Sequence, residues 1–166
     1  MNAPSLRQAV SPLVIGIDHL TIAVRDLEKS IAWYEATLGF SLAERKLVNG
    51  DKTSMKVAIL TSGPVRVVLV EGSEPESQVS RFIEQKGEGV THVALAVSSL
   101  DDALRRVEAV ARPALPEVRG DGIRQVFLEQ DPESGVRIEL VERAGGTFSE
   151  RSLREMFVAL EERDLF

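Results

Sequence analysis

Cysteine is absent from this chain of 166 residues, and only two histidines are present. The lack of cysteine excludes a disulfide framework, a zinc site built from thiolates and a catalytic thiol. Long apolar runs are lacking as well. Because a membrane-spanning helix needs about 20 predominantly apolar residues, we expect no transmembrane segment. Any metal ligation must therefore rest on histidines and carboxylates.

The balance of charge is acidic, with a formal net charge of −6. Such a surface repels a phosphate backbone or an anionic membrane, so neither nucleic acid nor a membrane is an expected partner. Residues 1–12 lack the apolar core and cleavage pattern of a secretion signal, and we expect a cytoplasmic protein. The length suits a single domain, residues 1–166, that buries about 70% of its unfolded surface.

Both histidines occupy the same place in an internal repeat. The segment Ile17–Val24 is similar to Val90–Val97, and His19 aligns with His92 at an offset of 73 positions. In each copy a strand pattern is followed by a helix pattern. The coincidence makes these two residues the first candidates for a functional site.

The repeat extends to the far end of each copy. Segment 136–142 matches segment 65–71 at five of seven positions. We therefore predict an α+β fold of two tandem β-α-β-β-β modules followed by a C-terminal helix. The modules span about 14–72 and about 88–143, and the last helix spans about 149–165.

Local signals predict where several elements begin and end. Asp26 is a typical N-cap and Gly39 a typical helix end. The prolines and glycines between residues 113 and 122 indicate a loop, and Ser152 with Glu155 indicates a capping box. Further expected elements are strands at 40–46, 54–60 and 123–129, a short helix at 78–85 and a helix at 101–110.

The alternation of side chains along the strands predicts two different sheet faces. Leu20, Ile22 and Val24 share an apolar face that helices should cover. In the second copy Val93, Leu95 and Val97 share the equivalent face. The opposite face carries small and polar residues, and His19, His92 and Glu139 fall on it. Small residues beside a histidine leave room, so we expect a cavity there.

Two imidazoles and one carboxylate form the 2-His-1-carboxylate set that binds non-haem Fe(II) and leaves coordination positions open. We predict that His19, His92 and Glu139 ligate a metal ion. In the alternative interpretation each histidine is structural and hydrogen-bonds the backbone. The symmetric placement of both histidines favours the metal site.

The motifs Ile17-Asp18-His19, Gly87–Ala94 and Arg137–Leu140 resemble the vicinal oxygen chelate superfamily. The resemblance covers about residues 15–143. It implies that the modules curl into a half-barrel around one divalent metal ion, and it implies the same three ligands.

Within this superfamily, the chain most resembles the catalytic domain of 4-hydroxyphenylpyruvate dioxygenase. Val68 stands where the epimerase and glyoxalase branch supplies a fourth ligand, and residues from Gly145 onwards are similar to the dioxygenase C-terminus. The resemblance implies an Fe(II)-dependent dioxygenase that takes O₂ and a small 2-oxo acid or similar chelating substrate. Gln125, Gln78, Phe127 and Phe148 would then contact the substrate.

Several of these residues have simpler interpretations. Gln78 could be a solvated helix start, Phe127 plain core, and Phe148 with the last helix a cover for the sheet. Lys56 points inward by strand parity and could hold a carboxylate, although a shift of one residue would place Met55 there instead. Thr91 departs from the dioxygenase pattern, which has glutamine at that position.

The alternative function is a metal-dependent epimerase of the methylmalonyl-CoA epimerase type, with Co(II), Mn(II) or Zn(II) instead of iron. It needs a base on an inner strand, for which only Glu71 or Glu129 could serve. A third possibility is a binding module without catalysis, but such members lack the metal ligands. Like other half-barrels of this kind, the chain could form a homodimer.

Overall fold

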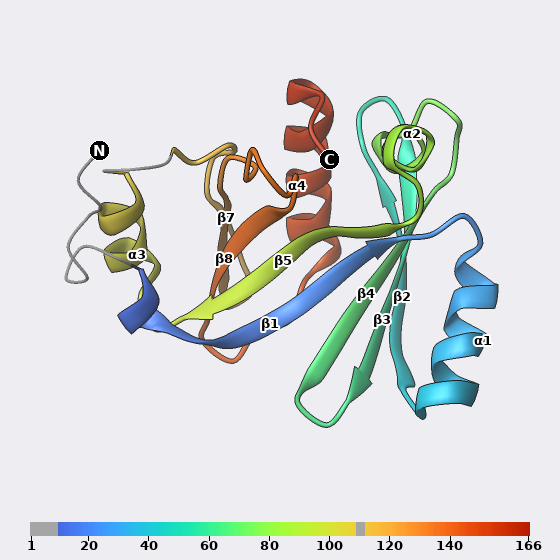
Figure 1. The fold of residues 1–166 in the computed structure, drawn as a ribbon, viewed down its shortest axis with the longest axis horizontal. Coiled ribbons are helices and arrows are strands. Elements are labelled where there is room, and N and C mark those ends of the chain that lie inside the picture. The colour runs from blue at the N-terminus through green and yellow to red at the C-terminus, as the bar shows by residue number, and fades with distance from the viewer. Residues whose placement is uncertain (1–9, 109–111) are drawn as a thin grey trace.

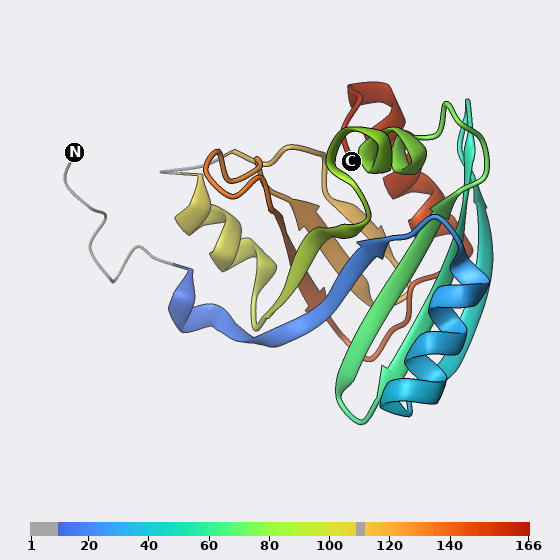
Figure 2. The same cartoon turned by 45° about the vertical axis from the view of Figure 1, so that its right-hand side comes forward.

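The computed structural model describes residues 10–108 and 112–166. They form one eight-stranded sheet with the strand order β2-β3-β4-β1-β5-β8-β7-β6. The sheet curls, and helix α4 lies against its concave side (Figures 1 and 2). The elements are β1 (Val14–Ala23), α1 (Leu27–Leu38), β2 (Ser41–Asn49), β3 (Ser54–Ser62), β4 (Val65–Gly72), α2 (Gln78–Lys86), β5 (Gly89–Val97), α3 (Leu100–Val107), β6 (Val118–Gly120), β7 (Ile123–Phe127), β8 (Arg137–Arg143) and α4 (Glu150–Arg163), after a 3-10 turn at Ser11–Leu13.

The strand order reflects the internal repeat. In the first module β1 pairs in parallel with β4, and in the second module β5 pairs in parallel with β8. The antiparallel pair β1–β5 joins the two modules at the centre of the sheet. The predicted fold class, an α+β protein of two β-α-β-β-β units with a C-terminal helix, is confirmed.

Helices α1 and α3 cover the outer face of the sheet. Leu27 and Ile31 of α1 pack with Leu60 and Leu69, and α3 covers the apolar side of β7 and β8. Helix α1 begins where the Asp26 carboxylate accepts the Lys29 N–H at 3.0 Å. It ends at Gly39, whose positive φ of 70° turns the chain away. Both predicted ends of this helix are therefore confirmed.

Helix α4 covers the inner face instead. Leu153, Met156, Phe157 and Leu160 are buried in the same apolar cluster as residues of β3, β4 and β8. The carboxylate of Glu161 fixes the far end of α4 by accepting hydrogen bonds from backbone N–H groups of residues 51–53. Within the described parts of the chain, no helix has the length and apolar character needed to cross a membrane.

Some predicted elements differ from the structure. The segment 113–122, which was predicted to be a loop, contains β6. This strand pairs with β7, and Asp121 and Gly122 form the turn between the two strands. Both turn residues have positive φ, as a type I′ hairpin turn requires. The N-cap of α4 is Ser149, whose hydroxyl accepts the Ser152 N–H, so the predicted capping box is wrong. The end of the predicted helix at 101–110 falls partly outside the described residues.

Candidate metal centre

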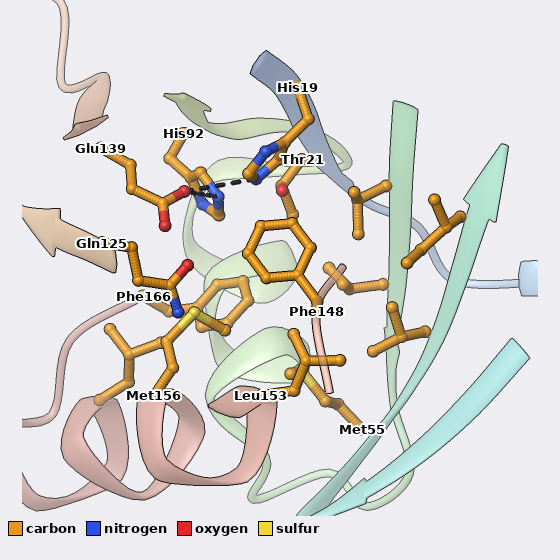
Figure 3. Close-up of a pocket in the computed structure, with 15 residues that line it drawn as sticks. His19, Thr21, Met55, His92, Gln125, Glu139, Phe148, Leu153, Met156 and Phe166 are labelled. Atoms are coloured by element: carbon orange, nitrogen blue, oxygen red, sulfur yellow. Dashed lines mark ion pairs between the residues drawn. The ribbon is translucent and has the colours of Figure 1, made fainter. Parts of the chain in front are cut away.

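His19, His92 and Glu139 meet on the inner face of the sheet (Figure 3). One ligand atom from each residue lies within 4.8 Å of the other two. The Nε2 atoms of His19 and His92 lie 3.3 Å and 3.4 Å from Glu139 Oε2. The three predicted ligands, which come from three strands, are therefore brought together with a spacing that suits one ion.

The repeat explains this convergence. His19 lies on β1 and His92 on β5, the two central strands that pair with each other. Glu139 lies on β8, directly opposite Ala94 of β5. In the first module the equivalent pair is Thr21 with Val68. The carboxylate thus has a valine as its symmetry counterpart, and the described residues place three candidate ligands at the site.

A β-bulge precedes each histidine. The pairing of β1 with β5 shifts register between Ile17 and His19, so Asp18 is the extra residue on β1. A second shift between Thr21 and Ile22 leaves Thr91 as the extra residue on β5. Asp18 and Thr91 occupy equivalent positions in the two modules. The bulges let consecutive side chains touch, which a regular strand forbids.

These two bulge residues orient the imidazoles. Asp18 Oδ1 lies 2.7 Å from His19 Nδ1, and the carboxylate can only accept, so Nδ1 carries the proton. Thr91 donates its hydroxyl proton to the Thr21 carbonyl at 3.3 Å, which leaves its oxygen to accept from His92 Nδ1 at 3.2 Å. Both Nε2 lone pairs are thereby free to bind a metal ion. Sequence reasoning did not find these partners.

Two arginines hold Asp18 in place. Arg143 contacts Asp18 through Nε and Nη2, the latter at 2.8 Å, and donates from Nη1 to the Gly146 carbonyl at 2.9 Å. Its guanidinium lies 4.7 Å from the centre of the Phe148 ring. Arg66 makes a longer contact with Asp18, at 3.4 Å. Arg143 therefore connects the support of one ligand to the wall of the cavity.

The pKa values of the three candidate ligands follow from burial and mutual contact. Burial alone would raise the pKa of Glu139, but the two imidazoles beside it lower the pKa to about 2. Burial opposes protonation of His19, yet Asp18 and Glu139 raise its pKa above the usual value. For His92 burial dominates and lowers the pKa. Glu139 is therefore ionised at neutral pH, as a metal ligand must be.

The buried carboxylate of Glu139 fits a bound cation. Its side chain is only 1% exposed, and neither oxygen has a hydrogen-bond partner in the described structure. An ionised carboxylate without a partner is costly to bury. While both imidazoles are neutral, with their protons on Nδ1, the Nε2 atoms do not supply the missing donors. A divalent ion at this point would satisfy all three residues.

The space beside the three residues is narrow and mainly apolar. Its volume of about 30 Å³ holds only a very few water-sized molecules. Besides the three candidate ligands, the cavity is lined by Thr21 and Gln125 and by apolar side chains from β3, β4, α4 and the chain end: Met55, Val57, Ile59, Val68, Val70, Phe148, Leu153, Met156, Leu160 and Phe166.

Two of the predicted substrate residues line this cavity, and a third, Phe127, packs against His92 beside it. Gln125 is 1% exposed, and neither atom of its amide has a partner. Phe148 packs edge-on against His19, with ring centres 5.2 Å apart. Phe127 packs in the same way against His92 at 4.9 Å but does not line the open space. Gln125 and Phe148 are thus placed to contact a bound molecule.

Two other predicted substrate residues lie elsewhere. The amide of Gln78 donates to Asp164 at 3.2 Å in a separate pocket. Lys56 lies on the opposite face of β3 and pairs with Glu71 at 2.7 Å. The predicted parity of β3 is wrong by one residue, because the pairing of Ile59 with Val68 turns the odd-numbered side chains inward. Met55 therefore takes the position expected for Lys56.

The fold and the site define a class of protein: a duplicated β-α-β-β-β protein with a candidate metal centre between its two halves. Residues 16–140 match the Glyoxalase/Bleomycin resistance protein/Dioxygenase superfamily. The chain belongs to this family, the vicinal oxygen chelate superfamily, as its motifs predict.

Two relatives and one structural neighbour are similar to this chain over most of its length. The protein YqjC of Bacillus subtilis is 29% identical over 139 residues, which are 81% of this chain and 96% of the relative. The structure of methylmalonyl-CoA epimerase from Mycobacterium tuberculosis is 32% identical with a TM-score of 0.68, over 87% of this chain and 93% of that one. A mutant 4-hydroxymandelate synthase from Streptomyces coelicolor shares the fold, with a TM-score of 0.77 at 16% identity over 91% and 54% of the two chains.

Proposed function

We propose that this protein is a divalent-metal-dependent enzyme whose small substrate binds the ion through two oxygen atoms. The observation that carries the proposal is the buried carboxylate of Glu139, which faces both imidazoles and has no hydrogen-bond donor. A divalent ion held there would act as a Lewis acid on a carbonyl group of the substrate. Three protein ligands leave room for such a chelating substrate.

The relatives favour the epimerase class, which was the alternative in our sequence interpretation and not the leading one. A methylmalonyl-CoA epimerase is among the solved structures that match over most of this chain at about one third identity. An epimerase moves a proton on and off a carbon next to a carbonyl. The first candidate function is therefore metal-dependent epimerisation or isomerisation of a small carbonyl acid or its thioester.

In this chain the proton would have to be moved by Glu139. It is the only carboxylate side chain that lines the described cavity, and the other side chains there are apolar, amide, hydroxyl or imidazole groups. The two bases considered from the sequence lie elsewhere: Glu71 accepts the Leu27 N–H at 2.7 Å, and Glu129 is exposed. Ligation through Oε2, the oxygen nearest both imidazoles, would leave Oε1 for the proton.

A second candidate, an Fe(II)-dependent dioxygenase, is favoured by a different observation. Val68 lines the cavity at the position symmetric to Glu139, so the described chain offers three ligands and no fourth. Fe(II) would supply the redox chemistry with O₂. The protein would then bind and orient a 2-oxo acid between Gln125 and Phe148. The apolar lining of the cavity would exclude water from it.

One experiment separates the two candidates. Protein loaded anaerobically with either Co(II) or Fe(II) is given 2-oxo acids, methylmalonyl-CoA and simple acyl thioesters in D₂O. Metal-dependent exchange of the α-proton, seen by NMR without oxygen uptake, is the result for an epimerase. Oxygen uptake with a 2-oxo acid that occurs in the Fe(II)-loaded protein and not in the Co(II)-loaded protein identifies the dioxygenase. Neither activity in protein that binds metal would contradict both candidates.

A further inference from the structure

A second cavity lies beside the candidate metal centre, and its lining is polar. Its volume is about 190 Å³, and it lies among α2, the segment before β8 and the chain end. Phe166 lines both this cavity and the metal cavity. We call the second cavity the polar pocket; it is lined by Gln78, Arg81, Phe82, Gln85, Lys86, Gln130, Arg137, Asp164, Leu165 and Phe166.

Arg137 is a buried cation without a counterion in the polar pocket. The residue is 5% exposed, and its Nε has no hydrogen-bond partner. One guanidinium nitrogen, Nη1, donates to the Leu128 carbonyl at 3.3 Å. Among the salt bridges of the described residues, none involves Arg137. An unpaired buried charge is expensive, so an anion from outside the chain would relieve a cost that the fold otherwise bears.

Lys86 adds a second cation to the same pocket. Its Nζ lies 5.4 Å from the centre of the Phe82 ring, and in the described structure it pairs with no carboxylate. Asp164 is the one acidic side chain of the lining. That carboxylate is already engaged, since Arg81 contacts it at 2.6 Å and Gln78 donates to it at 3.2 Å. Two cations thus remain unneutralised in a chain of net charge −6.

The position of Arg137 links the polar pocket to the candidate metal centre. Arg137 and Glu139 are two residues apart on β8, so their side chains leave the same face of the strand about 7 Å apart. Arg137 is also the strand neighbour of His92. Phe166 lies between the two cavities and packs edge-on against Phe82, with ring centres 6.1 Å apart.

We propose that the polar pocket binds an oxyanion, a carboxylate or phosphate group, through Arg137 and Lys86. The group belongs to the substrate, whose other end chelates the metal ion about one short carbon chain away. This assignment rests on the proposed metal-dependent function, and it narrows the substrate to acids with a second anionic group. Guanidinium and ammonium groups are the side chains that bind such oxyanions most strongly.

The pocket itself is tested without metal. Inorganic phosphate is titrated calorimetrically into protein treated with a chelator. We expect saturable binding that weakens about tenfold or more in Arg137→Gln, the loss that one charge-assisted contact supports, and several-fold in Lys86→Gln. Arg151→Gln, a change at an exposed arginine of α4, should bind phosphate like the unaltered protein.

The link to the substrate is tested with two acids that share the chelating end. Zn(II)-loaded protein is titrated with 2-oxoglutarate, which has a distal carboxylate, and with 2-oxobutyrate, which does not. We expect 2-oxoglutarate to bind about tenfold more tightly than 2-oxobutyrate. This difference in affinity should be lost in Arg137→Gln and reduced in Lys86→Gln. Equal affinity for the two acids would overturn the assignment to a substrate group, even where phosphate binds.

The results also separate this inference from the proposed function. Stoichiometric Zn(II) binding with phosphate affinity unchanged by Arg137→Gln and Lys86→Gln would overturn the oxyanion site alone. Phosphate binding that depends on Arg137 in a protein that binds no metal would overturn the proposed function alone. If Arg137→Gln fails to fold, Lys86→Gln still decides, because Lys86 lies on α2, outside the strands that carry the metal ligands.

Discussion

Each of the two histidine ligand candidates depends on the residue that contacts the Nδ1 side of its ring. Asp18 and Thr91 precede the two histidines, lie in equivalent bulges and engage Nδ1 of the following ring. One support is a carboxylate and the other a hydroxyl. A carboxylate partner makes an imidazole a stronger donor to a metal ion, so His19 and His92 are not equal ligands. His19 should be the more basic of the two.

Asp18→Asn tests this support. The amide still accepts a hydrogen bond from His19, but it has no charge and loses the ion pair with Arg143. We expect Zn(II) affinity to fall about 10- to 100-fold, measured by competition with a coloured chelator. Arg66→Gln removes only the longer contact to the same carboxylate and should bind Zn(II) nearly as the unaltered protein does. Equal affinities in all three proteins would contradict the assigned role.

The pH dependence of metal binding follows from the same contact. The pKa of His19 is raised, so protons compete with the ion on this ring up to a pH above the usual value of about 6.5. Affinity should therefore rise with pH across neutrality. In Asp18→Asn the rise should shift to lower pH, because an uncharged neighbour no longer favours the protonated ring. A profile that is identical in both proteins would refute this explanation.

Val68 keeps one side of the centre free of protein ligands. Val68→Gln would place an amide oxygen at the position symmetric to Glu139. We expect Zn(II) to bind about tenfold more tightly and chelating acids such as oxalate to bind the loaded protein more weakly. Val70→Gln is the matched control, since Val70 lines the cavity on the same strand two residues further on. Tighter metal binding in both variants would point to a general effect of polarity.

At the scale of elements, α4 closes the inner face and its far end is held by one carboxylate. Glu161 accepts from the N–H groups of Asp51, Lys52 and Thr53 and from the Thr53 hydroxyl. Burial opposes ionisation of this carboxyl, but the hydrogen bonds lower its pKa. The ionised form therefore stabilises the folded state, and with it the cover over the cavity.

Glu161→Gln should lower the free energy of unfolding at neutral pH by about 1–3 kcal/mol, measured with urea. Because the folded pKa is lowered, the contribution of Glu161 is complete above the unfolded value of about 4.3 and is lost as the pH falls through the folded value. The difference between the two proteins should therefore shrink in acid. Glu162→Gln, at an exposed neighbouring position, should change stability little at any pH.

The elements also show which features the sequence could predict. Hydrophobic alternation and the repeat were enough for every strand except β6, for the helices and for the meeting of His19, His92 and Glu139. The face of β3 was predicted wrongly because residues 57–60 are apolar on both faces of the strand, so a period of two does not choose between the faces there. The supports Asp18 and Thr91 escaped notice because bulges break the alternation on which the prediction depends.

At the scale of the whole molecule, the repeat builds a symmetric frame and the site departs from that symmetry. The two histidines are equivalent, whereas Glu139 has Val68 as its counterpart. Arg137 corresponds to Arg66, but Arg66 contacts Asp18 and Arg137 lines the polar pocket. The frame could be predicted because duplication is visible in the sequence. The polar pocket could not, because it forms between α2, the start of β8 and the chain end, which are far apart in the sequence.

Metal analysis of protein purified without oxygen and dialysed against a single divalent ion tests the metal centre itself. We expect one ion per chain, and none in His19→Ala or Glu139→Gln. Gln125→Leu, which changes a buried polar residue of the same cavity that is not a candidate ligand, should retain one ion. Full metal content in Glu139→Gln, or no metal in the unaltered protein, would contradict the central claim that His19, His92 and Glu139 hold the ion.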